Sequence, residues 1–121
     1  MLIFGHKLIE CEKFILFNKD KINKKCINLI SNYDENHIKK LKTSGEKWAI
    51  YAKNKDEIFL SNALKADFIL LEDNELAIFA SKVAEFYLFD SKILLILDEL
   101  KNLEKAYNLG VDGVVLRDFI S

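Results

Sequence analysis

The chain has 121 residues, 50% of them hydrophobic and 31% charged, and its 18 basic and 19 acidic residues leave a formal net charge of −1. This composition is typical of a single globular domain, and it excludes binding to nucleic acid or to an anionic membrane through overall charge. The longest apolar run, residues 93–97, is too short to span a bilayer. Residues 1–4 lack the basic flank of a signal peptide, so we expect a cytoplasmic protein.

The first 26 residues form an N-terminal extension without a regular period. Apolar residues at positions 8–9 and 14–17 lie on either side of a charged stretch, and we predict a hairpin or an edge strand there. Cys11 and Cys26 are expected to be reduced thiols, as is usual in a cytoplasmic chain. The cysteines and histidines lack the spacing of zinc ligands, so we expect neither a metal site nor a cofactor.

From residue 27 onward, short apolar runs alternate with segments of helical period. The last three runs are continuously apolar, which is typical of strands covered on both faces of a parallel sheet. Helices are predicted around residues 38–41, 58–64, 76–87 and 100–109. Strands are predicted at residues 27–31, 48–52, 67–71, 92–97 and 113–116.

Two segments of the chain can be superimposed without a gap, residues 48–73 and residues 93–118. Each contains a strand, a helix and then a turn with an aspartate before the next strand. We predict one α/β domain over residues 1–121, with repeated strand–helix units from residue 27. The favoured architecture is a three-layer sheet of five or six mostly parallel strands with helices on both faces. The alternative is half of a β/α barrel, which would leave an apolar face in need of a partner.

Four segments resemble the response-regulator receiver domain, a flavodoxin-like module of two-component signalling. The first is Asn32-Tyr33-Asp34-Glu35, which lies where the family carries an acidic pair for Mg²⁺. The others are residues 66–72, 93–98 and 108–119, which resemble the family's third, fourth and last strands.

The positions that carry the family's chemistry are changed in this sequence. Glu72 stands where the resemblance places the phosphorylated aspartate, and Leu97 or Asp98 stands where a hydroxyl is expected. Arg117 and Asp118 stand where the family has Lys-Pro. The resemblance therefore implies a small non-enzymatic interaction or regulatory module that lacks its phosphoacceptor.

Charged side chains follow the predicted strands, and ligands of open parallel α/β sheets bind at the carboxyl ends of the strands. Among these side chains, Glu72 and Arg117 are the pair with the most specific functional interpretation. A glutamate can mimic a phosphorylated state and pair with a fork-shaped guanidinium. The alternative is a set of ordinary solvated loop residues. The predicted ligand or regulatory pocket consists of Asp34, Glu72, Asp73, Asp98, Arg117 and Asp118.

A second hypothesis is a phosphate-metabolite-binding protein or enzyme derived from β/α-barrel units. Residues 110–116, Gly-Val-Asp-Gly-Val-Val-Leu, suit phosphate-binding barrels as well as receiver domains. Arg117 and the turn at residues 110–113 would then hold the anion.

A cluster of large apolar residues stands at the end of the longest predicted helix. Four adjacent residues of this kind cannot all face one core, because a helix buries a single stripe. We expect an exposed patch that binds a protein partner or a second copy in a homodimer. The alternative is that residues 8–17 fold over the patch. The predicted interface consists of Phe86, Tyr87, Leu88, Phe89, Phe119 and Ile120.

Overall fold

The computed structural model describes residues 1–18 and 21–121. Within these residues the strands are β1 (Leu2–Phe4), β2 (Phe14–Leu16), β3 (Ile27–Ile30), β4 (Trp48–Tyr51), β5 (Phe68–Leu71), β6 (Lys92–Leu97) and β7 (Gly113–Leu116). The helices are α1 (Glu35–Ser44), α2 (Lys55–Ala63), α3 (Asn74–Tyr87) and α4 (Leu103–Leu109), and a 3₁₀ turn, η1 (Arg117–Phe119), follows β7. The five strands and four helices predicted from residue 27 onward are all present. None of the described helices is long and apolar enough to cross a membrane.

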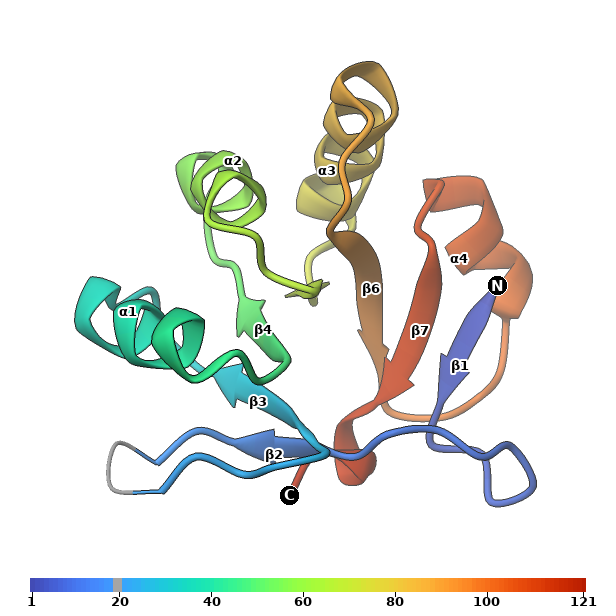
Figure 1. The fold of residues 1–121 in the computed structure, drawn as a ribbon. Helices are drawn as coiled ribbons and strands as arrows, with labels where there is room; N and C mark the ends of the chain where they lie inside the picture. The colour runs from blue at the N-terminus through green and yellow to red at the C-terminus, as the bar shows by residue number, and fades with distance from the viewer. Residues whose placement is uncertain (19–20) are drawn as a thin grey trace.

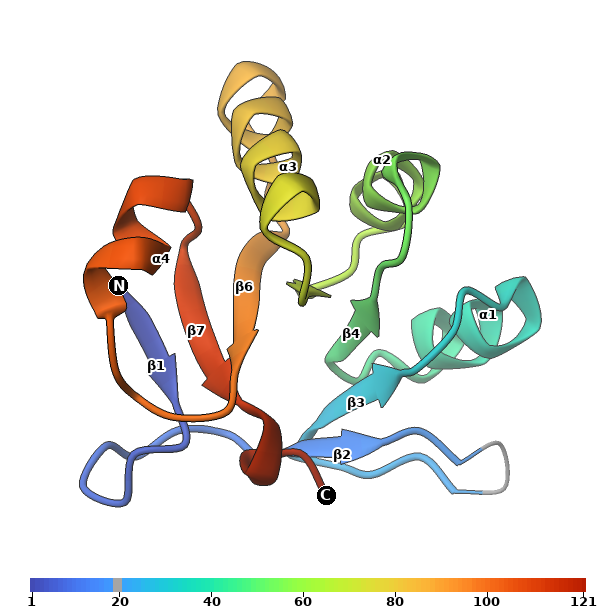
Figure 2. The ribbon, with the colours of Figure 1, turned by 180° about the vertical axis from the view of Figure 1, so that it is seen from behind.

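All strands of the sheet run in parallel, in the order β1-β7-β6-β5-β4-β3-β2. Each strand from β2 to β6 pairs with the next strand along the chain, and β1 pairs with the far side of β7. If the two ends of the sheet were joined into a ring, the strands would follow one another in chain order around it. The pairing that is missing from this ring is the one between β1 and β2. The sheet curls accordingly, so that its two edge strands approach each other (Figures 1 and 2). The predicted parallel α/β fold is confirmed.

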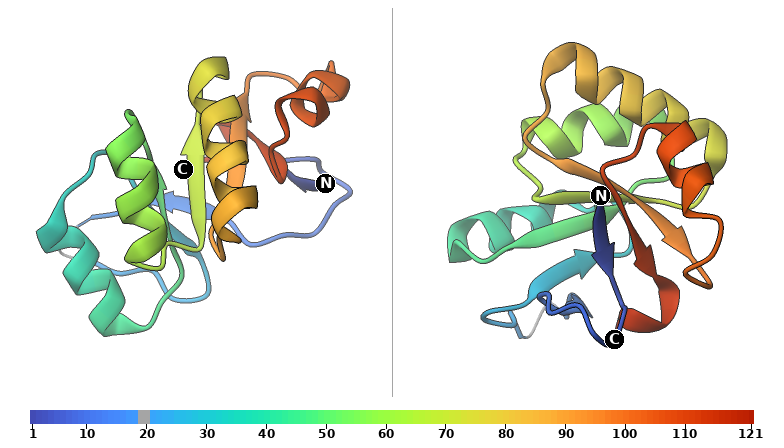
Figure 3. Two further views of the ribbon diagram at one scale, coloured as in Figure 1. Left: turned by 90° about the horizontal axis from the view of Figure 1, so that it is seen from above. Right: turned by 90° about the vertical axis from the view of Figure 1, so that its right-hand side faces the viewer.

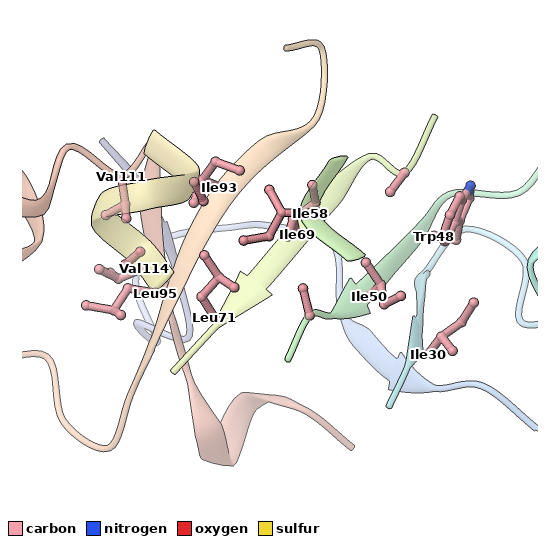
Figure 4. Close-up of a cluster of buried hydrophobic side chains, with 14 of the residues drawn as sticks. Ile30, Trp48, Ile50, Ile58, Ile69, Leu71, Ile93, Leu95, Val111 and Val114 are labelled. Atoms are coloured by element: carbon pink, nitrogen blue, oxygen red, sulfur yellow. The ribbon is translucent and has the colours of Figure 1, made fainter. Parts of the chain in front are cut away.

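The four helices lie on one face of this sheet, the convex one (Figure 3). Their buried side chains pack against the outward-facing residues of β3 to β7, including Trp48, Ile69 and Leu95 (Figure 4). The expectation of helices on both faces is therefore wrong, and the curled half-barrel that we gave as the alternative is what forms. Right-handed crossovers that always step in the same direction place every helix on the same side. The strand count is seven because β1 and β2 add an edge strand at each end.

The concave face is buried by its own side chains. The rings of Phe4, Phe14 and Phe68 meet edge to face with centroid separations of 5.1, 5.4 and 5.6 Å. Phe14 is fully buried and Phe4 is 7% exposed. The chain end closes the remaining gap, since Ser121 donates to the Phe14 carbonyl (3.0 Å) and accepts from the Leu16 amide (2.8 Å). The inner face therefore needs no partner to cover it, because the curl brings both sheet edges onto one aromatic cluster.

The N-terminal extension supplies both edge strands, and these two strands do not form a hairpin. Between them, Leu8 is 81% exposed and takes no part in the core. In the described residues between β2 and β3, Phe17 and Ile22 pack against the outer core. Asn28 fixes this segment from a fully buried position. Its side chain accepts from the amide of Asn23 and donates to the carbonyls of Asn23 and Lys47, at 2.9–3.1 Å.

The internal repeat appears as one hydrogen-bond pattern formed twice. The carboxylate of Asp67 accepts from the amide of Trp48 (3.0 Å), and the carboxylate of Asp112 accepts from the amide of Ile93 (2.8 Å). Each aspartate amide also donates to the carbonyl of the same partner, at 2.9 Å. The predicted aspartate before each strand thus ties that strand to the preceding one.

The same two aspartates show how β1 completes the pattern. The Asp67 carbonyl accepts from the amide of Lys92 in β6, and the Asp112 carbonyl accepts from the amide of Leu2 in β1, both at 3.0 Å. β1 therefore occupies, beside β7, the place that β6 has beside β5. An N-terminal strand takes the position that the next strand of a barrel would fill.

Two fully buried polar side chains should respond in opposite ways to truncation. The Ser61 hydroxyl has no hydrogen-bond partner among the described residues, so Ser61→Ala should leave the free energy of unfolding unchanged or raise it by about 1 kcal/mol. Asn28→Ala leaves the backbone groups of Asn23 and Lys47 without their hydrogen-bond partner. It should lower the free energy of unfolding by about 2 kcal/mol. Urea unfolding followed by circular dichroism measures both. A Ser61→Ala variant less stable than the wild type would show that its hydroxyl is bonded.

Candidate functional site

The six predicted pocket residues all follow strands at the carboxyl edge of the sheet. Asp34 stands directly before α1, Glu72 and Asp73 follow β5, Asp98 follows β6, and Arg117 and Asp118 lie in η1 after β7. The structure divides them into helix caps, an ion cluster and one exposed residue of η1, Asp118.

Two of the aspartates are occupied as helix caps. Asp34 accepts from the amides of Asn36 (2.9 Å) and His37 (3.2 Å) at the start of α1. Asp73 accepts from the amide of Leu76 (2.9 Å) at the start of α3. Such caps satisfy amides that a helix leaves unpaired in its first turn. The local role of these two carboxylates is therefore structural.

Arg117 is the centre of the ion cluster. Its Nε donates to Asp98 Oδ1 at 2.8 Å, and its Nη2 donates to Glu72 Oε1. The other Glu72 oxygen accepts from the Tyr51 hydroxyl. The predicted Glu72–Arg117 pair is thus formed, and the cluster links the ends of β4, β5, β6 and β7. Arg117 and Glu72 are each 45% exposed, so this is a surface cluster.

The cluster holds its members in their ordinary charge states. The hydrogen bonds from Tyr51 and Arg117 lower the pKa of Glu72. Burial, together with the bond to the Glu72 carboxylate, raises the pKa of Tyr51 to about 12. The bonds to Asp98 and Glu72 raise the pKa of Arg117. None of the three groups titrates near neutral pH, whereas an efficient general acid or base has a pKa close to the working pH.

Tyr51 and Glu72 of the cluster also line a hollow of about 400 Å³, together with Ala52 and Lys53 after β4, Asp73 after β5 and Leu76 of α3. Lys53 enters it with its ammonium 5.5 Å from the centre of the Tyr51 ring and bonded to Asn32. We did not predict Tyr51 as a site residue. The sequence could have indicated it, because Tyr51 is the last residue of a strand and carries a hydroxyl, and the neighbouring strand is followed directly by Glu72.

The structure separates the two groups expected to hold a phosphate. Gly110–Gly113 precedes β7 and Arg117 follows it, so four strand residues, roughly 13 Å, lie between them. A side chain at Gly113 would overlap the main chain of Leu2 in β1. This glycine is required by the close approach of β1 and not by an anion. Arg117 itself is engaged by two carboxylates.

The predicted interface residues fall into two groups at opposite ends of the strands. Phe86, Tyr87 and Leu88 are 79%, 64% and 83% exposed at the end of α3, and the N-terminal segment does not cover them. Phe119 and Ile120 pack against the inner cluster. Phe89 packs against the outer core. We call Phe86, Tyr87 and Leu88 the α3 patch.

Leu88 has a backbone conformation that is unfavourable for leucine. It ends α3 in the left-handed region with φ 53°. The helices α1 and α4 end in the same conformation, but with Gly45 and Gly110. Lys25, Lys65 and Asn102 also have a positive φ, and Leu88 is the one apolar side chain in this group. A residue with a Cβ pays about 1–2 kcal/mol in this region. Leu88 is thus both strained and exposed, and neither property helps the isolated chain to fold.

Neither a protein-family model nor a curated protein matches this sequence. The chain is therefore described by its own geometry, a curled parallel α/β sheet with a self-paired ion cluster at its carboxyl edge.

Loss of the Glu72 carboxylate should have a small effect on stability that depends on pH. A carboxyl group whose pKa is lowered by folding stabilises the protein above its ordinary pKa of 4.5, and this contribution is lost as the pH falls through the lowered value. Glu72→Gln should therefore lower the free energy of unfolding by no more than ~1 kcal/mol at pH 7. The difference from the wild type should disappear on acidification below pH 4.5.

The matched control is Glu85→Gln, an exposed carboxylate of α3 outside the cluster. Thermal unfolding from pH 3 to pH 7 compares the three proteins. A Glu72→Gln deficit that persists in acid would assign the effect to packing and not to charge.

Proposed function

We propose that this chain is a non-enzymatic interaction module of receiver-like organisation that lacks a phosphoacceptor and binds a second copy of itself through the α3 patch. The observation that carries the proposal is Leu88, a leucine kept in a left-handed and exposed position. Strained residues persist where function requires them.

The carboxyl edge of the sheet supports a regulatory and not a catalytic role. Glu72 stands where the receiver resemblance places the phosphorylated aspartate, and Tyr51 and Arg117 already occupy both of its oxygens. A glutamate held by two partners at the phosphoacceptor position would keep this site in one conformation. The concave face, where a barrel protein would bind a ligand, is packed by the rings of Phe4, Phe14 and Phe68.

The size of the α3 patch suits contact with an identical patch. A large aromatic side chain buries about 150–250 Å² when fully enclosed. The exposed parts of Phe86, Tyr87 and Leu88 therefore offer on the order of 400 Å² per copy. Two copies related by a twofold axis would bury roughly 800 Å² from these residues alone, close to the ~1,000 Å² of a small specific interface.

Aromatic contacts extend the α3 patch towards α2. The ring of Tyr87 lies 4.8 Å from that of Phe86 and 6.4 Å from that of Phe59, which is 40% exposed. Rigid aromatic side chains of this kind provide most of the binding energy in protein interfaces.

Treatment with Mg²⁺ and acetyl phosphate should leave the protein unmodified, because Glu72 replaces the phosphoacceptor. Intact-mass spectrometry should show no added phosphoryl group, while a phosphorylatable receiver domain in the same reaction gains one. An acyl phosphate on Glu72 or Asp73 would contradict the proposed loss of phosphoryl chemistry.

Leu88→Gly should make the monomer more stable and self-association weaker. Glycine removes the left-handed strain, and after its greater freedom in the unfolded chain is subtracted, the gain should be about 0.5–1 kcal/mol. Analytical ultracentrifugation should show a dimer for the wild type and at least a tenfold weaker dimer for the variant. Unfolding at a concentration where both are monomeric measures the stability.

The control is Leu8→Gly, which removes an equally exposed leucine (81%) from the loop between β1 and β2. It should leave the dimer unchanged and should not raise stability, because Leu8 does not have a positive φ. A monomeric wild type, or equal weakening by both variants, would refute self-association through the α3 patch.

A further inference from the structure

The near-zero net charge conceals a strong separation of charge along the chain. Residues 13–47 contain nine lysines and four acidic residues, a formal charge of +5. Residues 48–121 contain eight basic and thirteen acidic residues, a formal charge of −5. The first group forms β2, β3 and α1, and the second forms β4 to β7 and the other helices, so the two groups occupy different parts of the sheet (Figures 1 and 2).

Most of the lysines described on the positive side form no ion pair, although Glu10, Glu12 and Glu35 line hollows beside some of them. Of the lysines described between residues 13 and 47, only Lys47 forms an ion pair, with Glu12. The others are exposed and lie in two rows, one before and along the segment that precedes β3 and one on α1. We call them the lysine face: Lys13, Lys21, Lys24, Lys25, Lys39, Lys40 and Lys42.

A broad hollow of about 810 Å³ lies between the two rows. Ile22 lines it from the segment before β3, and Lys39, Lys40, Asn36 and Thr43 are among the α1 residues that line it. Ammonium and amide groups of this kind donate hydrogen bonds to phosphate oxygens. The hollow thus combines positive charge with neutral donors.

The chemistry of the lysine face favours a hydrophilic polyanion over a protein groove or a membrane. Among the large hydrophobic side chains in the described part of residues 13–47, Leu16 alone is exposed (49%), so little apolar surface is available there to anchor in a pocket or insert among lipid chains. The rings of Phe17 and His37 stack on each other at 4.9 Å and are not free to stack on bases. The only arginine of the chain, the residue suited to reading guanine, lies in the ion cluster with Glu72 and Asp98.

We infer that the lysine face binds the phosphate backbone of nucleic acid without sequence specificity. This differs from the expectation drawn from overall charge, because binding responds to the local field and the Debye length is only about 10 Å at 0.1 M salt. Charges more than about 10 Å from a strand bound at α1 are largely screened from it. The lysine face and the α3 patch lie on different elements, so this inference does not depend on the proposed dimer.

Fluorescence anisotropy with a labelled oligouridylate longer than ~16 nucleotides tests the inference. If five lysines each neutralise one phosphate of a single strand, affinity should fall about 100-fold between about 50 and 200 mM salt. A labelled oligonucleotide of different base composition should bind within about threefold of the first, since only the backbone is contacted.

Two triple variants with the same change in net charge locate the binding surface. Lys39→Glu, Lys40→Glu and Lys42→Glu on α1 should weaken binding at least tenfold and reduce the salt slope by about 2. Lys82→Glu, Lys101→Glu and Lys105→Glu lie on the acidic side, are equally exposed, and should change affinity less than threefold. Circular dichroism verifies that both variants are folded.

Three outcomes would overturn the inference. They are absence of binding by the wild type at low salt, equal weakening by the two triple variants, and binding to anionic vesicles or to an acidic peptide with greater affinity than to the oligonucleotide. Self-association at low salt that the α1 variant abolishes would instead assign the lysine face to the acidic side of a second copy.

Discussion

The structure depends on covering the concave face of a parallel sheet that has helices on one side only. Phe4 from one edge and Phe14 from the other meet Phe68 from the middle of the sheet, so the sheet must curl for the three rings to touch. These side chains fill the space within the curl in which a barrel protein would bind a ligand. The charged residues at the carboxyl edge then surround a packed core, and they pair with one another.

That pairing follows from the internal repeat. When residues 48–73 are superimposed on residues 93–118, Glu72 coincides with Arg117 and Lys53 coincides with Asp98. Equivalent positions therefore carry opposite charges, and the curl brings two of them into contact in the Arg117–Glu72 pair. The edge that would hold a ligand is neutralised from within the chain, which shifts the available binding chemistry to the outer surface.

The sequence predicted the strands, the helices from residue 27 and the Glu72–Arg117 pair, because apolar runs and a charge at each strand end are local signals. It did not predict the single helical layer, since a continuously apolar strand has the same appearance whether helices or the curl of its own sheet cover its second face. β1 and β2 have three residues each, too few to show a period.

Gly113 suggested an anion-binding turn but serves the approach of β1, a contact between the two ends of the chain. The lysine face was hidden by a balanced net charge.

The two proposed surfaces would reinforce each other if both are used. The α3 patch ends a helix in the acidic part of the chain, whereas the lysine face lies on α1 and the segment before β3, two helices away around the sheet (Figure 1). Pairing through α3 would leave both lysine faces exposed on the outside of the dimer. Two weak sites on one particle then act on the same polyanion at a high effective concentration, so the dimer binds more tightly than either copy without any new contact. Leu88 would in this way influence binding at a surface that it does not touch, and its strained conformation would be maintained for the assembly and not for the fold.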